Sequence, residues 1–143
     1  MGTRSNYRVI ERYTHNGKTY NNKLVNIYLQ YDGYPDGHPL DTAKWLTTGK
    51  LVNGLSTEDK DKVVFNGTSC RAAQLVARLK DGPGGTYIYP MNSWGKCLED
   101  YLYDIIVIEE KTINIVAYEN SKPKKKIFEG TPEEYVENFE NLK

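Results

Sequence analysis

The sequence predicts an α+β fold in which an antiparallel or mixed sheet has its helices packed mainly on one face. Three observations lead to this prediction. Asn16-Gly17 joins two alternating runs of residues, which is the signature of a β-hairpin. Two or three helical segments follow, and then several strand-like runs and a last helix. No β–α–β repeat dominates this order, so we expect the 143 residues to form one domain, residues 1–143.

The first half of the chain contains the hairpin and the helical segments. The alternating strands span residues 5–13 and 24–31. A helix is predicted over residues 39–48, with proline at its first position and glycine after its end. Residues 56–59 could cap a short helix, and a clearer helix is predicted over residues 69–80, with the preceding threonine as its N-cap. The predicted buried stripe of this second helix consists of Ala72, Ala73, Val76 and Leu79.

The second half of the chain contains most of the predicted strands. Residues 101–108 are apolar or aromatic on both faces apart from one aspartate, which is typical of a central strand. A turn leads from it into a strand over residues 112–118, and we expect the two hairpins to share one sheet. A short strand is predicted at residues 127–128. Thr131-Pro132-Glu133-Glu134 then combines an N-cap, a first-turn proline and an acidic third residue, which predicts a final helix.

Composition excludes several classes of protein. Only 38% of the residues are hydrophobic and the apolar runs are short, so we expect no membrane span and a cytoplasmic location. The two cysteines, Cys70 and Cys97, lie far apart, and the only histidines are His15 and His38. Such spacing is unsuited to a zinc site, so we expect free thiols, no metal and no cofactor.

The charges balance overall but are unevenly distributed along the chain. Residues 1–30 contain five arginines and lysines against the single acidic residue Glu11, whereas residues 99–143 are acidic. A protein that binds duplex nucleic acid usually presents a broad basic face, so we do not expect duplex binding. A small anion near the first strand is compatible with this pattern, and so are ordinary solvated strand faces.

The loop over residues 31–39 is the first candidate binding segment. Tyr31 and Tyr34 have side chains that stack on planar rings, as aromatic residues do in nucleotide sites. Asp32 and Asp36 can accept hydrogen bonds from ribose hydroxyls or ring amines, and His38 stands at the start of the predicted helix, where free N–H groups attract anions. The alternative is that these residues only build two turns, because turns require this composition.

Thr3, Arg4 and Ser5 form the second candidate segment. The antiparallel hairpin should bring the start of its first strand back beside Asp32. An arginine in that position can bind phosphate or carboxylate in a bidentate manner. The alternative is a surface ion pair between Arg4 and Asp32, which would contribute little.

Motifs of known enzymes are absent from the sequence. There is no nucleophile elbow, no Walker loop and no paired-glutamate motif, so no catalytic residue is assigned. Residues 81–85 are rich in glycine, but they are interpreted as a helix stop rather than a phosphate loop. One hydrolase alternative remains open, a phosphodiesterase in which Asp36 and His38 act as acid and base.

Three blocks carry a resemblance. Residues 1–5 (MGTRS), residues 30–38 (QYDGYPDGH) and residues 72–75 (AAQL) resemble a family of small, largely uncharacterised proteins of bacteria and their phages. The similarity runs from the N-terminus to about Gly85, and the blocks identify the family without naming an activity. Phages also encode proteins of similar size that sequester the nucleotide signals of bacterial immune systems, so the resemblance implies a phage anti-defence role.

These observations favour a non-enzymatic protein that binds a nucleotide-derived ligand, such as a cyclic oligonucleotide or a cyclic ADP-ribose-like signal. In this hypothesis Arg4 meets phosphate, Tyr31 or Tyr34 stacks, and Asp32 with His38 sets specificity. The alternatives are a module that inhibits a host protein and the small hydrolase. We also expect a homo-oligomer, because small binding proteins often place a pocket at a symmetric interface. Candidate interface aromatics are Tyr87, Tyr89, Tyr101 and Tyr103.

Overall fold

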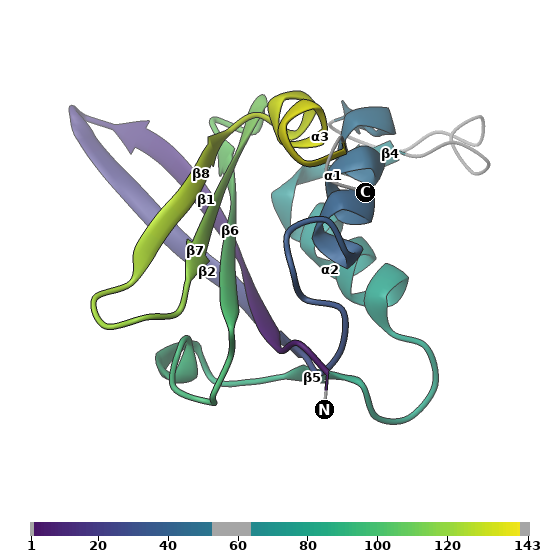
Figure 1. Ribbon diagram of the computed structural model, residues 1–143. Coiled ribbons are helices and arrows are strands. Elements are labelled where there is room, and N and C mark those ends of the chain that lie inside the picture. Colours follow the sequence, from purple (N-terminus) through teal and green to yellow (C-terminus); the bar gives the residue numbers. More distant parts are fainter. Residues whose placement is uncertain (1, 53–63, 141–143) are drawn as a thin grey trace.

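The computed structural model describes residues 2–52 and 64–140, and Figure 1 shows how their elements are arranged. The capping prediction for residues 56–59 lies outside the described residues. In chain order the elements are β1 (Ser5–His15), β2 (Lys18–Leu29), α1 (His38–Thr48), β3 (Lys50–Val52), β4 (Val64–Asn66), α2 (Gly67–Leu79), β5 (Thr86–Ile88), the 3-10 helix η2 (Met91–Ser93), β6 (Tyr101–Ile108), β7 (Thr112–Glu119), β8 (Lys125–Gly130) and α3 (Pro132–Glu140).

One six-stranded sheet contains both predicted hairpins, in the strand order β5-β2-β1-β6-β7-β8. β1 pairs antiparallel with β2 but parallel with β6, so the sheet is mixed. The three α-helices cover one face of this sheet (Figure 1). The predicted α+β class and the shared sheet are therefore confirmed. β3 and β4 form a separate two-stranded parallel sheet, which the sequence did not predict.

The tight turn of the first hairpin follows from its sequence. Asn16 and Gly17 have φ values of 50° and 77°, the left-handed conformation that a two-residue type I′ turn needs. Asparagine and glycine adopt this conformation at the lowest cost, which is why this dipeptide fixes the register from His15–Lys18 to Ile10–Lys23. A bulge between Val9 and Ile10 then shifts the pairing by one residue up to Ser5–Leu29.

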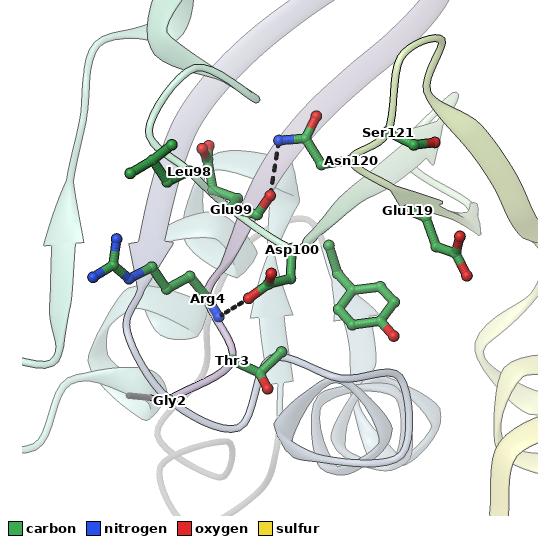
Figure 2. A pocket seen from close by; sticks show the side chains of 10 residues that line it. Gly2, Thr3, Arg4, Leu98, Glu99, Asp100, Glu119, Asn120 and Ser121 are labelled. Carbon is green, nitrogen blue, oxygen red and sulfur yellow. Dashed lines mark hydrogen bonds between the residues drawn. The ribbon is translucent and has the colours of Figure 1, made fainter.

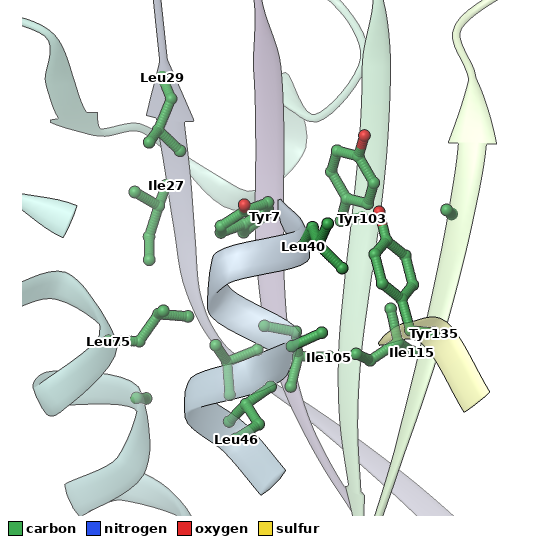
Figure 3. Close-up of a cluster of buried hydrophobic side chains, with 14 of the residues drawn as sticks. Tyr7, Ile27, Leu29, Leu40, Leu46, Leu75, Tyr103, Ile105, Ile115 and Tyr135 are labelled. Atoms are coloured by element: carbon green, nitrogen blue, oxygen red, sulfur yellow. The ribbon is translucent and has the colours of Figure 1, made fainter. Parts of the chain in front are cut away.

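The core lies between the sheet and the helices. β6 is central, and six consecutive residues of its eight are buried, as its apolar sequence predicts. Figure 3 shows Leu40 and Leu46 of α1 and Tyr135 of α3 pointing toward the side chains of the sheet. The main buried residues are Tyr7, Val9, Ile27, Leu40, Ala43, Leu46, Leu75, Tyr103, Ile105, Ile115, Tyr135 and Phe139.

Helix α2 differs from its prediction at its start and in its buried face. It begins at Gly67, and Thr68 is 1% exposed inside the first turn rather than serving as the N-cap. The buried side chains are those of Thr68, Arg71, Ala72 and Leu75, whereas Ala73 is exposed. The buried stripe is therefore rotated toward Arg71. The sequence prediction left this residue out of the stripe because a charged side chain is usually exposed.

The C-terminal elements agree with the sequence at the helix and differ at the strand. Thr131 and Glu134 form the expected capping box, with amide-to-side-chain hydrogen bonds of 2.9 and 3.1 Å in the two directions. β8 spans six residues instead of the two predicted. The prediction was too short because the lysines at the start of this segment are typical of a solvated connection. On this edge strand, however, Lys126 faces solvent and pairs with Glu129 at 2.6 Å.

The opposite face of the sheet carries polar and charged side chains beneath residues 89–100. Arg8 binds Asp104 through two hydrogen bonds of 2.7 and 2.8 Å. The Trp94 ring lies over the Arg8 guanidinium at 3.6 Å. Asn6 and Asn26 are fully buried and share a hydrogen bond of 2.6 Å. On this face, buried polar groups share the interior with a small apolar cluster of Ile10, Ile106 and Val116.

Candidate functional site

The loop that joins β2 to α1 lies beside the start of β1, as the hairpin geometry predicts. The amide of Gly33 donates a hydrogen bond of 3.0 Å to the carbonyl of Thr3. Ser5 is fully buried beneath this loop, and a Cβ atom at position 33 would lie 2.6 Å from the Cβ atom of Ser5. Close packing therefore requires glycine at position 33, and Ser5 packs against the loop instead of facing a ligand.

The remaining predicted residues divide mainly between two pockets. The first, which we call the loop pocket, has a volume of about 590 Å³ and is lined in part by Tyr31, Asp32 and His38. The second, which we call the Arg4 groove, has a volume of about 720 Å³ and is lined in part by Thr3 and Arg4 (Figure 2). The two linings share no residue of the described chain. The rest of the loop pocket consists of Leu29, Asp41, Thr42, Arg78, Leu79, Asp81, Gly84, Gly85 and Thr86.

Tyr34 and Asp36 belong to neither lining. The Tyr34 hydroxyl lies 3.5 Å from a carboxylate oxygen of Asp32, and its ring is 40% exposed. Both aspartates add to the raised pKa of Tyr34, with Asp32 as the largest cause. Burial is the main cause that raises the pKa values of Tyr101 and Tyr135, and the Asp36 carboxylate adds to both increases. Asp36 therefore also acts on tyrosines outside the loop.

The start of α1 offers fewer free donors than the sequence suggested. Asp32 has a φ of 57°, and its carbonyl accepts the amide of His38 at 3.1 Å. The amides of Leu40 and Asp41 donate to the carbonyl of Gly37 at 3.1 and 3.4 Å. The expectation of unpaired N–H groups at this helix start is thus wrong, because the turn itself supplies their acceptors.

His38 is a neutral side chain within the loop pocket. Burial lowers its pKa to about 4, against opposing contributions from Asp32, the Tyr31 carbonyl and Asp41. The Tyr7 hydroxyl lies 2.5 Å from Nδ1 of His38. The tautomer of the ring decides whether Nδ1 accepts from this hydroxyl or donates to it. Asp36 does not line this pocket.

The loop pocket carries more negative than positive charge. Its carboxylates come from Asp32, Asp41 and Asp81, and its one cationic side chain is Arg78, whose guanidinium lies 5.3 Å from the Trp45 ring. Carboxylates accept hydrogen bonds, so the pocket suits a ligand that presents several hydroxyl or amino donors. At its rim, the Tyr31 ring is 60% exposed and can cover a planar group.

Glycines of the segment between α2 and β5 close the loop pocket on its other side. Lys80 donates to the carbonyls of Gly84 and Thr86 at 3.0 and 2.8 Å, which holds this segment in place. Gly84 and Gly85 both have a φ of 76°, a conformation that favours glycine. From the sequence these glycines are predicted only to stop a helix, and Asp41, Thr42 and Arg78 are not predicted to line a site. The position of Asp41 and Thr42 near the start of α1 is the signal that could have revealed these two residues.

Most polar groups around the Arg4 groove are engaged within the protein. The Asp100 carboxylate accepts the Arg4 amide at 3.0 Å. Glu99 is 3% exposed, and its two oxygens accept the amides of Gly95 and Cys97 at 2.9 and 2.5 Å. Figure 2 shows the Asn120 side chain bonded to the backbone of Glu99, at 2.8 Å. The Arg4 groove is thus built around structural hydrogen bonds.

Comparisons with family models, with curated proteins and with solved structures found no match to this chain. Within residues 2–52 and 64–140, no helix is long and apolar enough to cross a membrane. The same residues contain no group of three or more histidine, cysteine, aspartate or glutamate side chains placed to hold a metal ion. Cys70 and Cys97 are both free thiols.

Proposed function

We propose that this protein is a non-enzymatic binder that sequesters a small nucleotide-derived ligand in the loop pocket. The observation that carries the proposal is the meeting of an exposed tyrosine, several carboxylates and one arginine around a volume of about 590 Å³. Pockets of roughly 300–1,000 Å³ with a few convergent polar groups are typical of small-molecule sites. In keeping with the phage resemblance, the proposed setting is the cytoplasm of an infected host, where capture of an immune signal would blunt defence.

Each lining group has a definite part in this proposal. Tyr31 stacks on a base, Asp32 and Asp41 accept from ribose hydroxyls or ring amino groups, and Arg78 meets a phosphate. With several carboxylates against one arginine, the pocket disfavours a ligand that carries many phosphates. A cyclic ADP-ribose-like signal, which is rich in hydroxyls and low in charge, fits this balance better than a larger cyclic oligonucleotide. The sequence predicted that Arg4 binds the phosphate, but Arg4 lies in the neighbouring groove. In this proposal Arg78 binds the phosphate instead.

The state of His38 supports binding rather than hydrolysis. A general acid or base works best when its pKa lies near the operating pH and it can reach the reacting group. The buried ring has a pKa of about 4 and is already hydrogen-bonded to the Tyr7 hydroxyl. These contacts fix the ring in place and leave little capacity for proton transfer.

The experiment is incubation with a panel of nucleotide signals, removal of free ligand, and heat release followed by mass spectrometry. The proposal predicts uptake and intact release of one ligand class. Tyr31→Ala should lose most of this uptake, whereas Tyr87→Ala, a matched change at a tyrosine 39% exposed on β5, should retain it. Release of an altered product would indicate the hydrolase, and absence of uptake across the panel would refute the binder.

A protein-interaction module is the second candidate, and edge strand β5 favours it. Ile88 is 58% exposed there beside Tyr87, and an edge strand offers unpaired backbone groups to another chain. A homo-oligomer built through this edge belongs to the same candidate. Light scattering after size exclusion should then show a dimer that Ile88→Lys converts to a monomer, without any change in nucleotide uptake.

A further inference from the structure

Arg71 is a buried cation in a part of the molecule that the loop pocket does not include. It lies in the second turn of α2 and is 4% exposed. One side of its guanidinium is covered by the Phe65 ring, with 4.5 Å between the guanidinium carbon and the ring centroid. Its Nε and Nη1 atoms are buried and have no hydrogen-bond partner among residues 2–52 and 64–140.

A pocket of about 300 Å³ adjoins this side chain, and we call it the Arg71 pocket. It opens where the end of α1, the β6–β7 turn and the start of α3 converge. Lys111 stands on that turn and adds a second positive charge. The complete lining is Leu46, Thr47, Gly49, Arg71, Lys111, Thr112, Ile113, Thr131, Pro132 and Glu133.

A charge in this situation requires compensation. Burial lowers the pKa of Arg71 to about 10, so the guanidinium is still protonated at neutral pH. A buried cation without a partner is strongly destabilising, because it loses hydration and gains no attraction in return. The one carboxylate in the described lining belongs to Glu133, which is exposed and forms no ion pair with Arg71 in the described structure.

We propose that the Arg71 pocket binds a small oxyanion of the phosphate type. The Arg71 guanidinium provides charge-assisted hydrogen bonds, Lys111 adds attraction at the mouth, and the hydroxyls of Thr112 and Thr131 provide further donors. The anion is either free inorganic phosphate or the phosphoryl group of a larger molecule, and the volume of about 300 Å³ accommodates the phosphoryl group in both cases. This site is separate from the loop pocket and does not depend on the function proposed there.

The test is thermal unfolding and calorimetric titration of the full chain in phosphate and in chloride at equal ionic strength. Phosphate at about a hundredfold excess over its dissociation constant should raise Tm by roughly 5 °C or more. Arg71→Met, which retains an unbranched apolar stem without the charged guanidinium, should abolish this rise. Arg12→Met, a matched change on β1 outside the Arg71 pocket, should retain it. Glu133→Gln should tighten phosphate binding a few-fold by removing a repulsive charge.

Three results would overturn the proposal. They are an equal response of the wild type to phosphate and chloride, a full phosphate response in Arg71→Met, and a loss of stability in Arg71→Met when phosphate has no effect on the wild type. The last result would mean that Arg71 is paired within the chain. If Arg71→Met does not fold, Lys111→Ala at the mouth of the pocket replaces it as the test variant. Lys111→Ala should bind phosphate several-fold more weakly than the wild type, and unchanged binding would refute the site. Phenyl phosphate distinguishes the sources: binding comparable to phosphate supports a phosphoryl group, and exclusion supports the free ion.

Discussion

The loop pocket and the Arg71 pocket lie at opposite ends of the same two helices and differ in charge. The loop pocket contains Asp41 from the start of α1 and Arg78 from the end of α2, whereas the Arg71 pocket contains Thr47 and Arg71 from the other ends. In the first, carboxylates outnumber the single arginine. In the second, a buried cation stands without a counterion in the described structure.

This difference shows that the ligand a polar side chain can bind depends on the hydrogen bonds and ion pairs that the side chain already makes within the protein. Carboxylates and a neutral histidine suit a ligand with several donors, and an unpaired guanidinium suits an acceptor with negative charge. Ligands should therefore divide between the two ends, with nucleoside-like groups at one and small oxyanions at the other.

Arg8 provides the largest expected effect, because it is a partly buried arginine that is paired with the buried Asp104. Asp104→Ala would leave its guanidinium in the condition of Arg71, without a carboxylate. We expect the free energy of unfolding to fall by about 3–5 kcal/mol, measured by urea denaturation. Glu129→Ala, which removes the exposed partner of Lys126, is the control and should change stability little. A comparably small effect of Asp104→Ala would mean that an unpaired arginine is tolerated, and the argument for Arg71 would weaken.

His38 gives the loop pocket a dependence on pH. Its pKa is about 4 in the folded protein and 6.5 in a model peptide, so between these values the unfolded chain binds a proton that the folded chain does not. Stability is thus fully present above pH 6.5 and is lost as the pH falls toward 4. The loss between pH 7 and pH 4.5 should be about 2–3 kcal/mol. His38→Gln retains an acceptor for Tyr7 and should remove this component in urea titrations at both pH values. An equal pH dependence in wild type and variant would contradict the buried neutral ring.

Thr131 gives a smaller effect at the rim of the Arg71 pocket. Thr131→Ala removes one half of the capping box of α3 and should lower the free energy of unfolding by about 1 kcal/mol. Thr131→Ser, which retains the hydroxyl, should restore most of the loss. Equal losses in both variants would show that the methyl group and its packing, rather than the cap, stabilise the start of α3.

Much of the fold could be predicted because local chemistry and tertiary structure agree. Asn16-Gly17 favours a type I′ turn wherever it occurs, and the doubly apolar β6 can only be central. The errors in the predicted elements occur where tertiary contacts override composition. The lysine-rich start of edge strand β8 was not predicted to be a strand, and α2 begins before its predicted start, with Thr68 buried by packing.

The predicted site was only partly located, because neighbouring backbones do not decide which pocket their side chains line. The backbones of residues 2–5 and 30–33 do lie side by side, joined by the bond from Gly33 to Thr3. Thr3 and Arg4 nevertheless line a different pocket from Tyr31 and Asp32. Arg71 carried a readable signal, since it occupies the i+3 position between the buried Thr68 and Leu75 on one helical face.

The most direct test of the account is calorimetric titration of the ligand captured from the nucleotide panel against wild type, Tyr31→Ala and Arg4→Ala. The loop pocket predicts that Tyr31→Ala weakens binding about tenfold to a hundredfold, the loss of roughly 1–3 kcal/mol of stacking. Arg4→Ala should bind within a few-fold of wild type, because Arg4 lines the neighbouring groove. The opposite result, with Arg4→Ala losing the ligand and Tyr31→Ala retaining it, would place the site in the Arg4 groove and contradict the account.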